Sequence, residues 1–324
     1  MLIQFAVVGR SLQPPDVERG LMKRSLMATT LLLALATAAC GADGGTVAAT
    51  VNGSNIAADE VTSLVFDTSV EPNPAEFAGY LGLLVQWTIV EQRAEADYGI
   101  TPSPEEIDVQ VQQVLTDFPY TGTLEEFLEE QNVSESAMRR YATQLLINEQ
   151  VQQELSTTVE APTDEDAQQA IDEDPNPWTE VCAAHLLVAT EEEAQVAMDR
   201  LADGEEFAAV ASELSLDTGS GANGGDLGCS SPAGYVTEFA DATMTAPLGE
   251  VVGPVETEFG FHVIVVESRT TSPVAEVRES LLESALSEAL NTWFADAIGA
   301  ATIVVTPEYG TWVTEPTPQV LPPG

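Results

Sequence analysis

The sequence predicts an α+β protein in which a small domain of strands and short helices lies between a helical N-terminal module and a further C-terminal helix. Apolar residues recur at helical spacing over 47–160, strand-like runs alternate with short helical stretches over 178–269, and a helical pattern returns over 270–306. The 324 residues, of which 44% are hydrophobic, suffice for a sizeable core and favour two domains over one.

The charge of the chain excludes some partners. The sequence has 53 acidic and 10 basic residues, a net charge of −43, and Lys23 is its only lysine. Such a surface repels nucleic acid and anionic lipid headgroups, so neither is an expected partner of the soluble part. Two interpretations of the acidity stay open: attraction of basic unfolded chains, or a solvated surface suited to a saline medium.

Residues 1–39 have the layout of a signal peptide. The basic pair Lys23 and Arg24 precedes the apolar stretch 31–39, which ends in small residues before Cys40. That stretch is too short for a membrane-spanning helix. Three methionines are candidate translation starts: Met1, Met22 and Met27.

The residues around Cys40 resemble a bacterial lipobox, in which the cysteine is lipidated and becomes the new N-terminus. The small residues Ala38 and Gly41 fit that pattern, whereas Thr37 stands where an aliphatic residue is usual. Lipid on Cys40, followed by a tether over 40–46, would hold the protein at the outer face of the bacterial cell membrane without a spanning helix. Plain secretion is the alternative.

The module over 47–160 begins with a strand and continues as helices. Residues 47–51 favour a short strand, and the Asn-Gly pair at 52–53 favours a turn. Four helices are then expected: one that ends at Tyr98 before Gly99, one that opens at Pro104, a short one after Thr123 with capping-box spacing, and a longer one after Ser134. Their apolar stripes are expected to form an ordinary core.

The segments on either side of the small domain differ in character. Residues 161–177 are rich in Pro, Asp and Glu and are expected to form a linker or the entrance to a domain. A helix is expected from about Val274 to Ile298, followed by a β-branched run at 302–305. Residues 307–324 form a Pro-rich tail, and its last part, 316–324, is expected to be disordered.

The small domain contains a series of short motifs that resemble one family in residue type, order and spacing. The motifs are Ala184–Val188, Gly204–Ala211, Ser215–Asp217, Gly224–Gly228, Phe239, Gly249–Val255 and Phe259–Ile264. They resemble the parvulin peptidyl-prolyl cis/trans isomerases over the whole of 180–269. The resemblance implies a four-stranded antiparallel sheet with helices around it and prolyl isomerase activity.

The implied reaction requires neither a metal nor a cofactor. An X-Pro bond rotates slowly because of its partial double-bond character, with a barrier of about 18–20 kcal/mol, and no bond is broken. A site that favours the twisted amide over both planar forms is sufficient, and an apolar pocket helps. The sequence has two histidines and no metal-ligand spacing, which excludes a His-rich metal site.

The resemblance assigns catalytic positions to three residues. His185 and His262 are expected to face each other at the sheet as a hydrogen-bonded pair that shapes the pocket, not as proton-transfer groups. Asp217 is expected beside the bond that rotates. The alternatives are two satisfied core histidines and a turn aspartate.

The resemblance also assigns three substrate-binding positions. Phe239 matches the aromatic floor of the proline pocket, Tyr235 stands where Met is common, and Phe259 matches a pocket-edge position. For each of them simple packing is the alternative. The sequence shows no basic cluster near these positions, so selectivity for phosphoserine-proline is not expected.

Two cysteines belong to the small domain. Cys182 lies on its first expected strand and Cys229 follows the Gly-Asp-Leu-Gly motif. In a four-stranded sheet the two could be neighbours, and an exported protein would oxidise such a pair, so we expect a disulfide. The alternative, Cys229 as a nucleophile, finds no adjacent base other than the two histidines.

The order of the modules resembles the SurA and PrsA foldases, in which the C-terminal segment, here 270–306, packs back on the N-terminal module. Two functions stay open. The protein is either an isomerase that accelerates the folding of unfolded or nascent exported proteins with X-Pro bonds, or a holdase chaperone that uses the parvulin domain as a peptide clamp. A structural envelope protein has no motif in its support.

Overall fold

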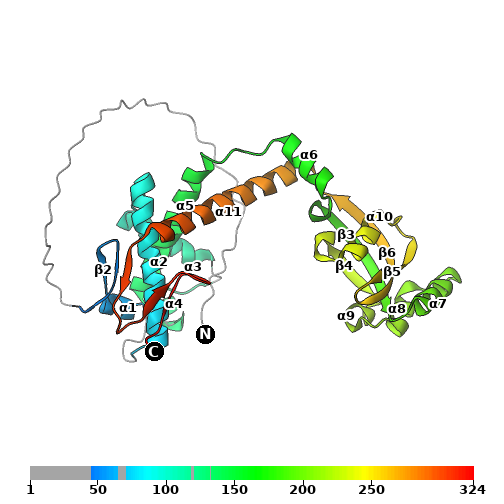
Figure 1. Cartoon of the computed structure of the whole chain (residues 1–324), viewed down its shortest axis with the longest axis horizontal. Coiled ribbons are helices and arrows are strands. Elements are labelled where there is room, and N and C mark those ends of the chain that lie inside the picture. Colours follow the sequence, from blue (N-terminus) through cyan, green and yellow to red (C-terminus); the bar gives the residue numbers. More distant parts are fainter. Residues whose placement is uncertain (1–44, 65–70, 118–119, 132) are drawn as a thin grey trace. The chain divides into compact units, whose positions relative to one another are not determined.

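The computed structural model describes residues 45–64, 71–117, 120–131 and 133–324 (Figure 1). The expected signal peptide at 1–39 and the expected lipidation site, Cys40, lie outside the described residues.

A small sheet joins the two ends of the described chain. Strands β1 (Val47–Val51) and β2 (Ser54–Ala57) form an antiparallel hairpin. Its turn contains Asn52 at φ 50° and Gly53 at φ 87°, which suits the Asn-Gly pair in the sequence. Strand β7 (Ile303–Val305) pairs with the other edge of β1, so the sheet order is β2-β1-β7.

Five helices follow in the N-terminal module. They are α1 (Ala58–Thr62), α2 (Pro74–Tyr98), α3 (Pro104–Asp117), α4 (Leu124–Gln131) and α5 (Glu135–Ser156). Asn73 and Glu76 form a reciprocal capping box at the start of α2, and Gly99 ends that helix in the left-handed conformation at φ 70°. Ser134 caps α5. These boundaries agree with the stop and start signals of the sequence.

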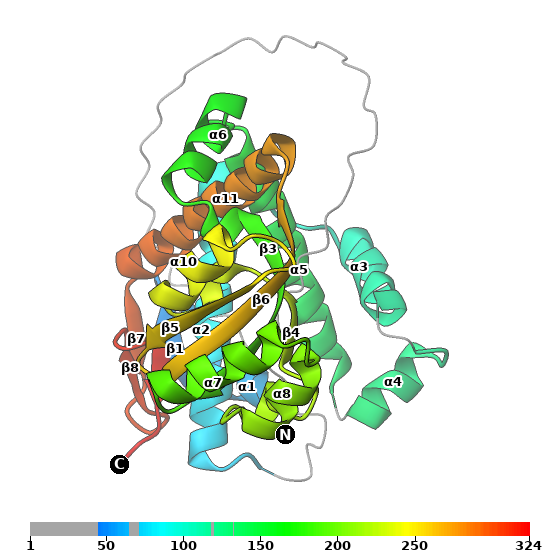
Figure 2. The same ribbon diagram turned by 90° about the vertical axis from the view of Figure 1, so that its right-hand side faces the viewer.

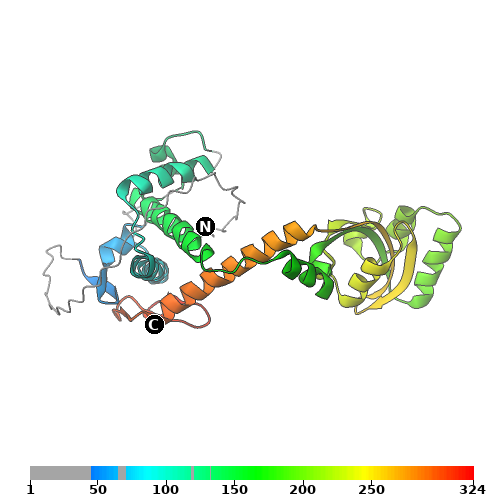
Figure 3. The same ribbon diagram turned by 90° about the horizontal axis from the view of Figure 1, so that it is seen from above.

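The long C-terminal helix α11 (Val274–Ala300) packs on the N-terminal helices and is continuous in Figure 3. Its Leu290 and Trp293 share a buried cluster with Ile147 and Val151 of α5. The indole N–H of Trp293 also donates to Asp97 Oδ2 at 2.9 Å. Within the described part of the chain, we find no helix with the length and apolarity needed to cross a membrane.

The segment 161–177, expected to be a linker, contains helix α6 (Asp164–Glu173) and the short 3-10 turn η1 (Asn176–Trp178). Thr163 and Asp166 form a capping box, and α6 packs against α11. The acidic residues of this segment therefore lie in the first turn of a helix, where negative charge interacts favourably with the helix dipole.

The expectation that 316–324 is disordered is wrong. Strands β8 (Thr311–Val313) and β9 (Gln319–Leu321) form a hairpin that packs on α2. Val320 is 4% exposed and lies against Gly82, where an added Cβ would come within 3.1 Å of the Val320 nitrogen. The close contact between Val320 and α2 depends on this glycine, and composition alone does not predict that contact.

The central domain is a four-stranded antiparallel sheet with helices on both faces (Figure 2). Its strands are β3 (Thr179–Val188), β4 (Asp226–Ser230), β5 (Val251–Thr257) and β6 (Gly260–Thr271), in the order β4-β3-β6-β5. Helices α7 (Glu191–Ala202) and α8 (Phe207–Leu214) pack on one face. Helix α10 (Thr237–Thr245) packs on the other, and the short helix α9 (Thr218–Gly221) and the 3-10 turn η2 (Pro232–Gly234) flank β4. The predicted α+β fold is confirmed.

Candidate active site

The two histidines of the chain meet on the α10 face of the central sheet. His185 lies on β3 and His262 on β6, where Leu187 is the register partner of His262. The two Nδ1 atoms are 3.0 Å apart, and the rings stack with a centroid distance of 5.3 Å. Both side chains are buried, with 6% and 4% exposure. A buried pair of this kind must satisfy its polar atoms internally.

Asp217 and Ser220 complete the partners of His185. Asp217 Oδ2 lies 2.9 Å from His185 Nε2 and accepts a 2.6 Å hydrogen bond from Ser220 Oγ. Asp217 also caps α9, because its Oδ1 accepts from the Gly219 N–H at 3.0 Å. The Ser220 hydroxyl, followed by His185, holds the pKa of Asp217 well below its usual range. Asp217 is therefore a carboxylate that can only accept hydrogen bonds.

The carboxylate sets the direction of a hydrogen-bond chain. His185 Nε2–H donates to Asp217, because a carboxylate can only accept; in the tautomer with no second ring proton on His185, its Nδ1 accepts from the Nδ1–H of His262. His262 Nε2 then accepts from the hydroxyl of Thr257 at 2.8 Å. Burial, followed by the nearby His185, lowers the pKa of His262 to about 4, so this ring is neutral at pH 7.

A glycine allows the loop before β4 to approach His185. The Gly225 carbonyl accepts a hydrogen bond from the His185 backbone N–H at 2.9 Å. Gly225 has φ +84°, and an added Cβ would lie only 2.1 Å from the His185 carbonyl oxygen. This position therefore requires glycine.

Phe239 of α10 covers the histidine pair. Its ring stands edge-on to His185 at 5.5 Å and to His262 at 5.1 Å, and it is 4% exposed. Tyr235 stands edge-on to Phe239 at 4.9 Å, and its hydroxyl lies 2.6 Å from Ser230 Oγ in a hydrogen bond. The aromatic rings and the histidines thus form one contiguous cluster on this face of the sheet.

Phe259 is placed differently from the other expected residues. It lies in the turn between β5 and β6 and is 62% exposed. Its backbone N–H donates to Thr257 Oγ1 at 3.1 Å, so it joins the histidine network through its backbone. Its ring lies in solvent, as single apolar side chains on a protein surface often do.

Sequence reasoning missed three polar residues of this cluster: Ser220, Ser230 and Thr257. Ser220 stands three residues after Asp217, at the spacing of a side-chain cap on a helical turn, and this signal could have identified it. Thr257 and Ser230 have no comparable local signal. They meet His262 and Tyr235 only once the strands are in register.

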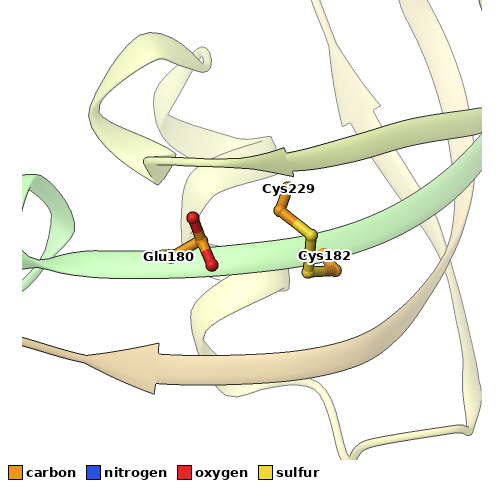
Figure 4. A group of neighbouring side chains, drawn as sticks. All are labelled: Glu180, Cys182 and Cys229. Atoms are coloured by element: carbon orange, nitrogen blue, oxygen red, sulfur yellow. A yellow bond between two sulfur atoms is a disulfide. The ribbon is translucent and has the colours of Figure 1, made fainter.

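Cys182 and Cys229 are joined by a disulfide, and they lie directly opposite each other on β3 and β4 (Figure 4). Glu180 lies beside them, and across the described ranges of the chain this trio is the only group of three candidate metal ligands. A metal would require thiolates, whereas both sulfurs are bound to each other. The trio therefore does not fit a metal in the oxidised state.

The two basic residues of 178–269 are engaged away from the histidines. Arg200 pairs with Glu205 and Glu213. Arg269 donates to the backbone carbonyls of Thr243 and Ala246. Among the described residues of the domain, neither arginine forms a hydrogen bond or ion pair with the histidines or with Tyr235.

Comparisons with known proteins place this domain in one family. The model of the PPIC-type PPIASE domain matches residues 180–270. Foldase protein PrsA of Oceanobacillus iheyensis is 30% identical over 263 residues, which cover 81% of this chain and 79% of the relative. Foldase protein PrsA of Caldanaerobacter subterraneus subsp. tengcongensis is 34% identical over 167 residues, or 52% of this chain.

The extent of these matches varies. The matched segment spans 54% of the Caldanaerobacter relative and 39% of a PrsA from Halalkalibacterium halodurans. A crystal structure of PrsA from Bacillus cereus is 22% identical and covers 68% of this chain and 82% of its own, with a TM-score of 0.39. The family assignment depends on the Oceanobacillus alignment and the domain match, not on that structure. The chain belongs to the PrsA foldase family and carries a parvulin-type peptidyl-prolyl isomerase domain.

Proposed function

We propose that the protein accelerates cis/trans isomerisation of X-Pro bonds in exported proteins, and that the pocket consists of His185, His262, Asp217, Phe239 and Tyr235. The observation that carries this proposal is the buried histidine pair with the edge of Phe239 against both rings. It unites, in one place, an apolar floor and polar groups whose orientation is fixed. Such a site can bind a prolyl ring without covalent chemistry.

The proposed role of the histidine pair is orientation. Each ring nitrogen already has a partner, and His262 is neutral because burial lowers its pKa to about 4. Proton transfer is not required, since rotation about the amide breaks no bond. The network instead holds two rigid rings beneath the substrate, while the Phe239 and Tyr235 rings favour the less polar, twisted amide over the planar forms.

We infer that the substrates are unmodified X-Pro segments of unfolded chains. A phosphate before proline would need a cation, and the domain's two arginines pair elsewhere. Phe259, 62% exposed beside Thr257, is proposed as the edge that contacts residues next to the proline. The net charge of −43 favours clients of the opposite sign.

The proposed location is the outer face of the cell membrane. The signal layout at 1–39 and the lipobox-like residues before Cys40 support export and lipid attachment. Intact mass of the membrane-extracted protein tests this. A lipid adduct on a chain that begins at Cys40 is expected, and an unmodified N-terminus would leave plain secretion.

The isomerase and the holdase are separated by one substitution. Phe239→Ala is expected to lower the catalysed cis/trans exchange of an Ala-Leu-Pro-Phe peptide, measured by NMR exchange spectroscopy, while suppression of aggregation of an unfolded client persists. Val196→Ala on α7 truncates an apolar side chain that is exposed and lies outside the proposed pocket, and this control is expected to change neither. A folded wild-type protein that suppresses aggregation without accelerating exchange would favour the holdase.

A further inference from the structure

Strand β4 is a weakly held edge of the central sheet. It has one neighbour, β3, and only three register pairs with an irregularity between Cys182 and Ala184. Four of its five residues, from Asp226 to Ser230, are polar, Gly or Cys, and Gly228 has φ +65°. Such a strand gains little from packing, so a covalent link to β3 matters for its position.

The disulfide lies on the face of the sheet opposite the proposed pocket. Val181 and Ala183 pack in the same buried cluster as Phe239, so Cys182 between them points to the other face. Cys229 is its direct partner, and the next residue, Ser230, is paired with Val181. Because neighbouring residues of a strand face opposite ways, fixing Cys229 behind the sheet fixes Ser230 in front of it.

Ser230 connects this strand to the pocket. Its hydroxyl is 2.6 Å from the Tyr235 hydroxyl, and the Tyr235 ring stands 4.9 Å from the Phe239 ring. Phe239 in turn touches both histidines. The next residue, Ser231, donates to the Asn176 carbonyl at 2.8 Å, so the strand end is held at two points.

We infer that the Cys182–Cys229 disulfide is a positioning element of the proline pocket, acting through Ser230 and Tyr235, and that isomerase activity therefore depends on the thiol redox state. This inference rests on the proposed isomerase function. The Cys229 side is exposed, so a soluble dithiol can reach the bond. The dithiol gives up two electrons and two protons, becomes a cyclic disulfide, and leaves Cys182 and Cys229 as thiols.

The test compares oxidised and dithiothreitol-reduced protein, using the chain that follows the expected signal peptide. Isomerisation of an Ala-Leu-Pro-Phe peptide is measured by NMR exchange, because this assay uses no coupling protease whose own disulfides dithiothreitol would reduce. Reduction is expected to lower kcat/KM about fivefold, the factor that corresponds to one neutral hydrogen bond. Tyr235→Phe, which keeps the ring and removes the hydroxyl, is expected to cause a similar loss. In that variant reduction should have no further effect, because the link is already cut.

Two controls separate an effect on the position of the pocket residues from a general loss of stability on reduction. Cys182→Ser with Cys229→Ser should match the reduced wild type and ignore dithiothreitol. Ser230→Ala keeps the disulfide and should lower kcat/KM by the same factor, which provides a test even if the reduced domain unfolds. The inference is overturned if kcat/KM of the folded reduced protein, or of Ser230→Ala, stays within twofold of the value for the oxidised wild type. It is also overturned if reduction lowers kcat/KM of Tyr235→Phe by the same factor as that of the wild type. An inactive oxidised wild type would instead refute the proposed function.

Discussion

Protonation of His262 should destabilise the central domain in acid, and the loss in the free energy of unfolding can be worked out from the structure. Burial places the pKa of this ring at about 4, against an ordinary value of 6.5. Between these two values the unfolded chain binds a proton that the folded chain does not, so stability falls as the pH falls. At about 1.4 kcal/mol per pH unit, the loss between pH 6.5 and 4 is about 3 kcal/mol.

The pH window distinguishes His262 from its neighbour Asp217. The pKa of Asp217 is held below its ordinary value of 3.8, so the stability that its carboxylate contributes is lost only below that pH. Of these two neighbours, His262 therefore accounts for most of the change above pH 4. The other acidic groups of the protein make the same contribution to the pH dependence of stability in a variant that lacks only this imidazole. His262→Gln is therefore the matched reference.

The assay uses the fact that the chain has two histidines. Their Hε1 signals are followed by NMR from pH 8 to pH 4, and His262→Gln assigns them. The His262 signal is expected to stay constant to about pH 5 and then shift with a midpoint near 4. In urea unfolding, the stability advantage of the wild type over His262→Gln should shrink by about 3 kcal/mol from pH 7.5 to pH 4. A His262 midpoint near 6.5 would refute the buried neutral ring.

Further substitutions test local packing and helix capping. Gly225→Ala should destabilise the domain by about 3 kcal/mol in urea unfolding, because the added Cβ would meet the His185 carbonyl. Gly228→Ala is the control: this glycine also has a positive φ but has open space around it, so the loss of stability should be only about 1 kcal/mol. Val320→Ala should lower stability by about 2 kcal/mol, since it leaves a cavity against α2, and an unchanged thermal midpoint would argue that the C-terminal hairpin is not packed there. Asn73→Ala should cost about 1 kcal/mol through the lost helix cap, and Asn73→Asp should restore it.

Local signals predicted the elements that local chemistry determines. Gly99 after Tyr98, the capping box at Thr123 and the Asn-Gly turn at 52–53 each act within a few residues, and the structure has its boundaries there. The pairing of the two histidines was predicted from the resemblance to the parvulins, because in that family the order of the motifs goes with a known strand register. Hydrophobic periodicity alone would not have paired His185 with His262.

The features that were missed depend on distant partners. The β8–β9 hairpin is ordered because Val320 fits against Gly82, over two hundred residues earlier in the chain, and its Pro-rich composition gives no sign of that contact. Thr257 reaches His262 only through the β5–β6 register. Composition does not distinguish helix α6 from a linker, because acidic residues are common both at helix N-termini and in loops.

The proposed proline pocket is tested most directly by the catalysed cis/trans exchange of an Ala-Leu-Pro-Phe peptide, compared between the purified wild-type protein and Phe239→Leu. The leucine keeps the pocket apolar but removes the aromatic edge that meets both histidines. Clear acceleration by the wild type, reduced at least tenfold in Phe239→Leu with the fold intact by circular dichroism, is the predicted result, a tenfold change being about 1.4 kcal/mol of transition-state stabilisation. Equal acceleration by both proteins would contradict the placement of the pocket, and no acceleration by either would contradict the isomerase function itself.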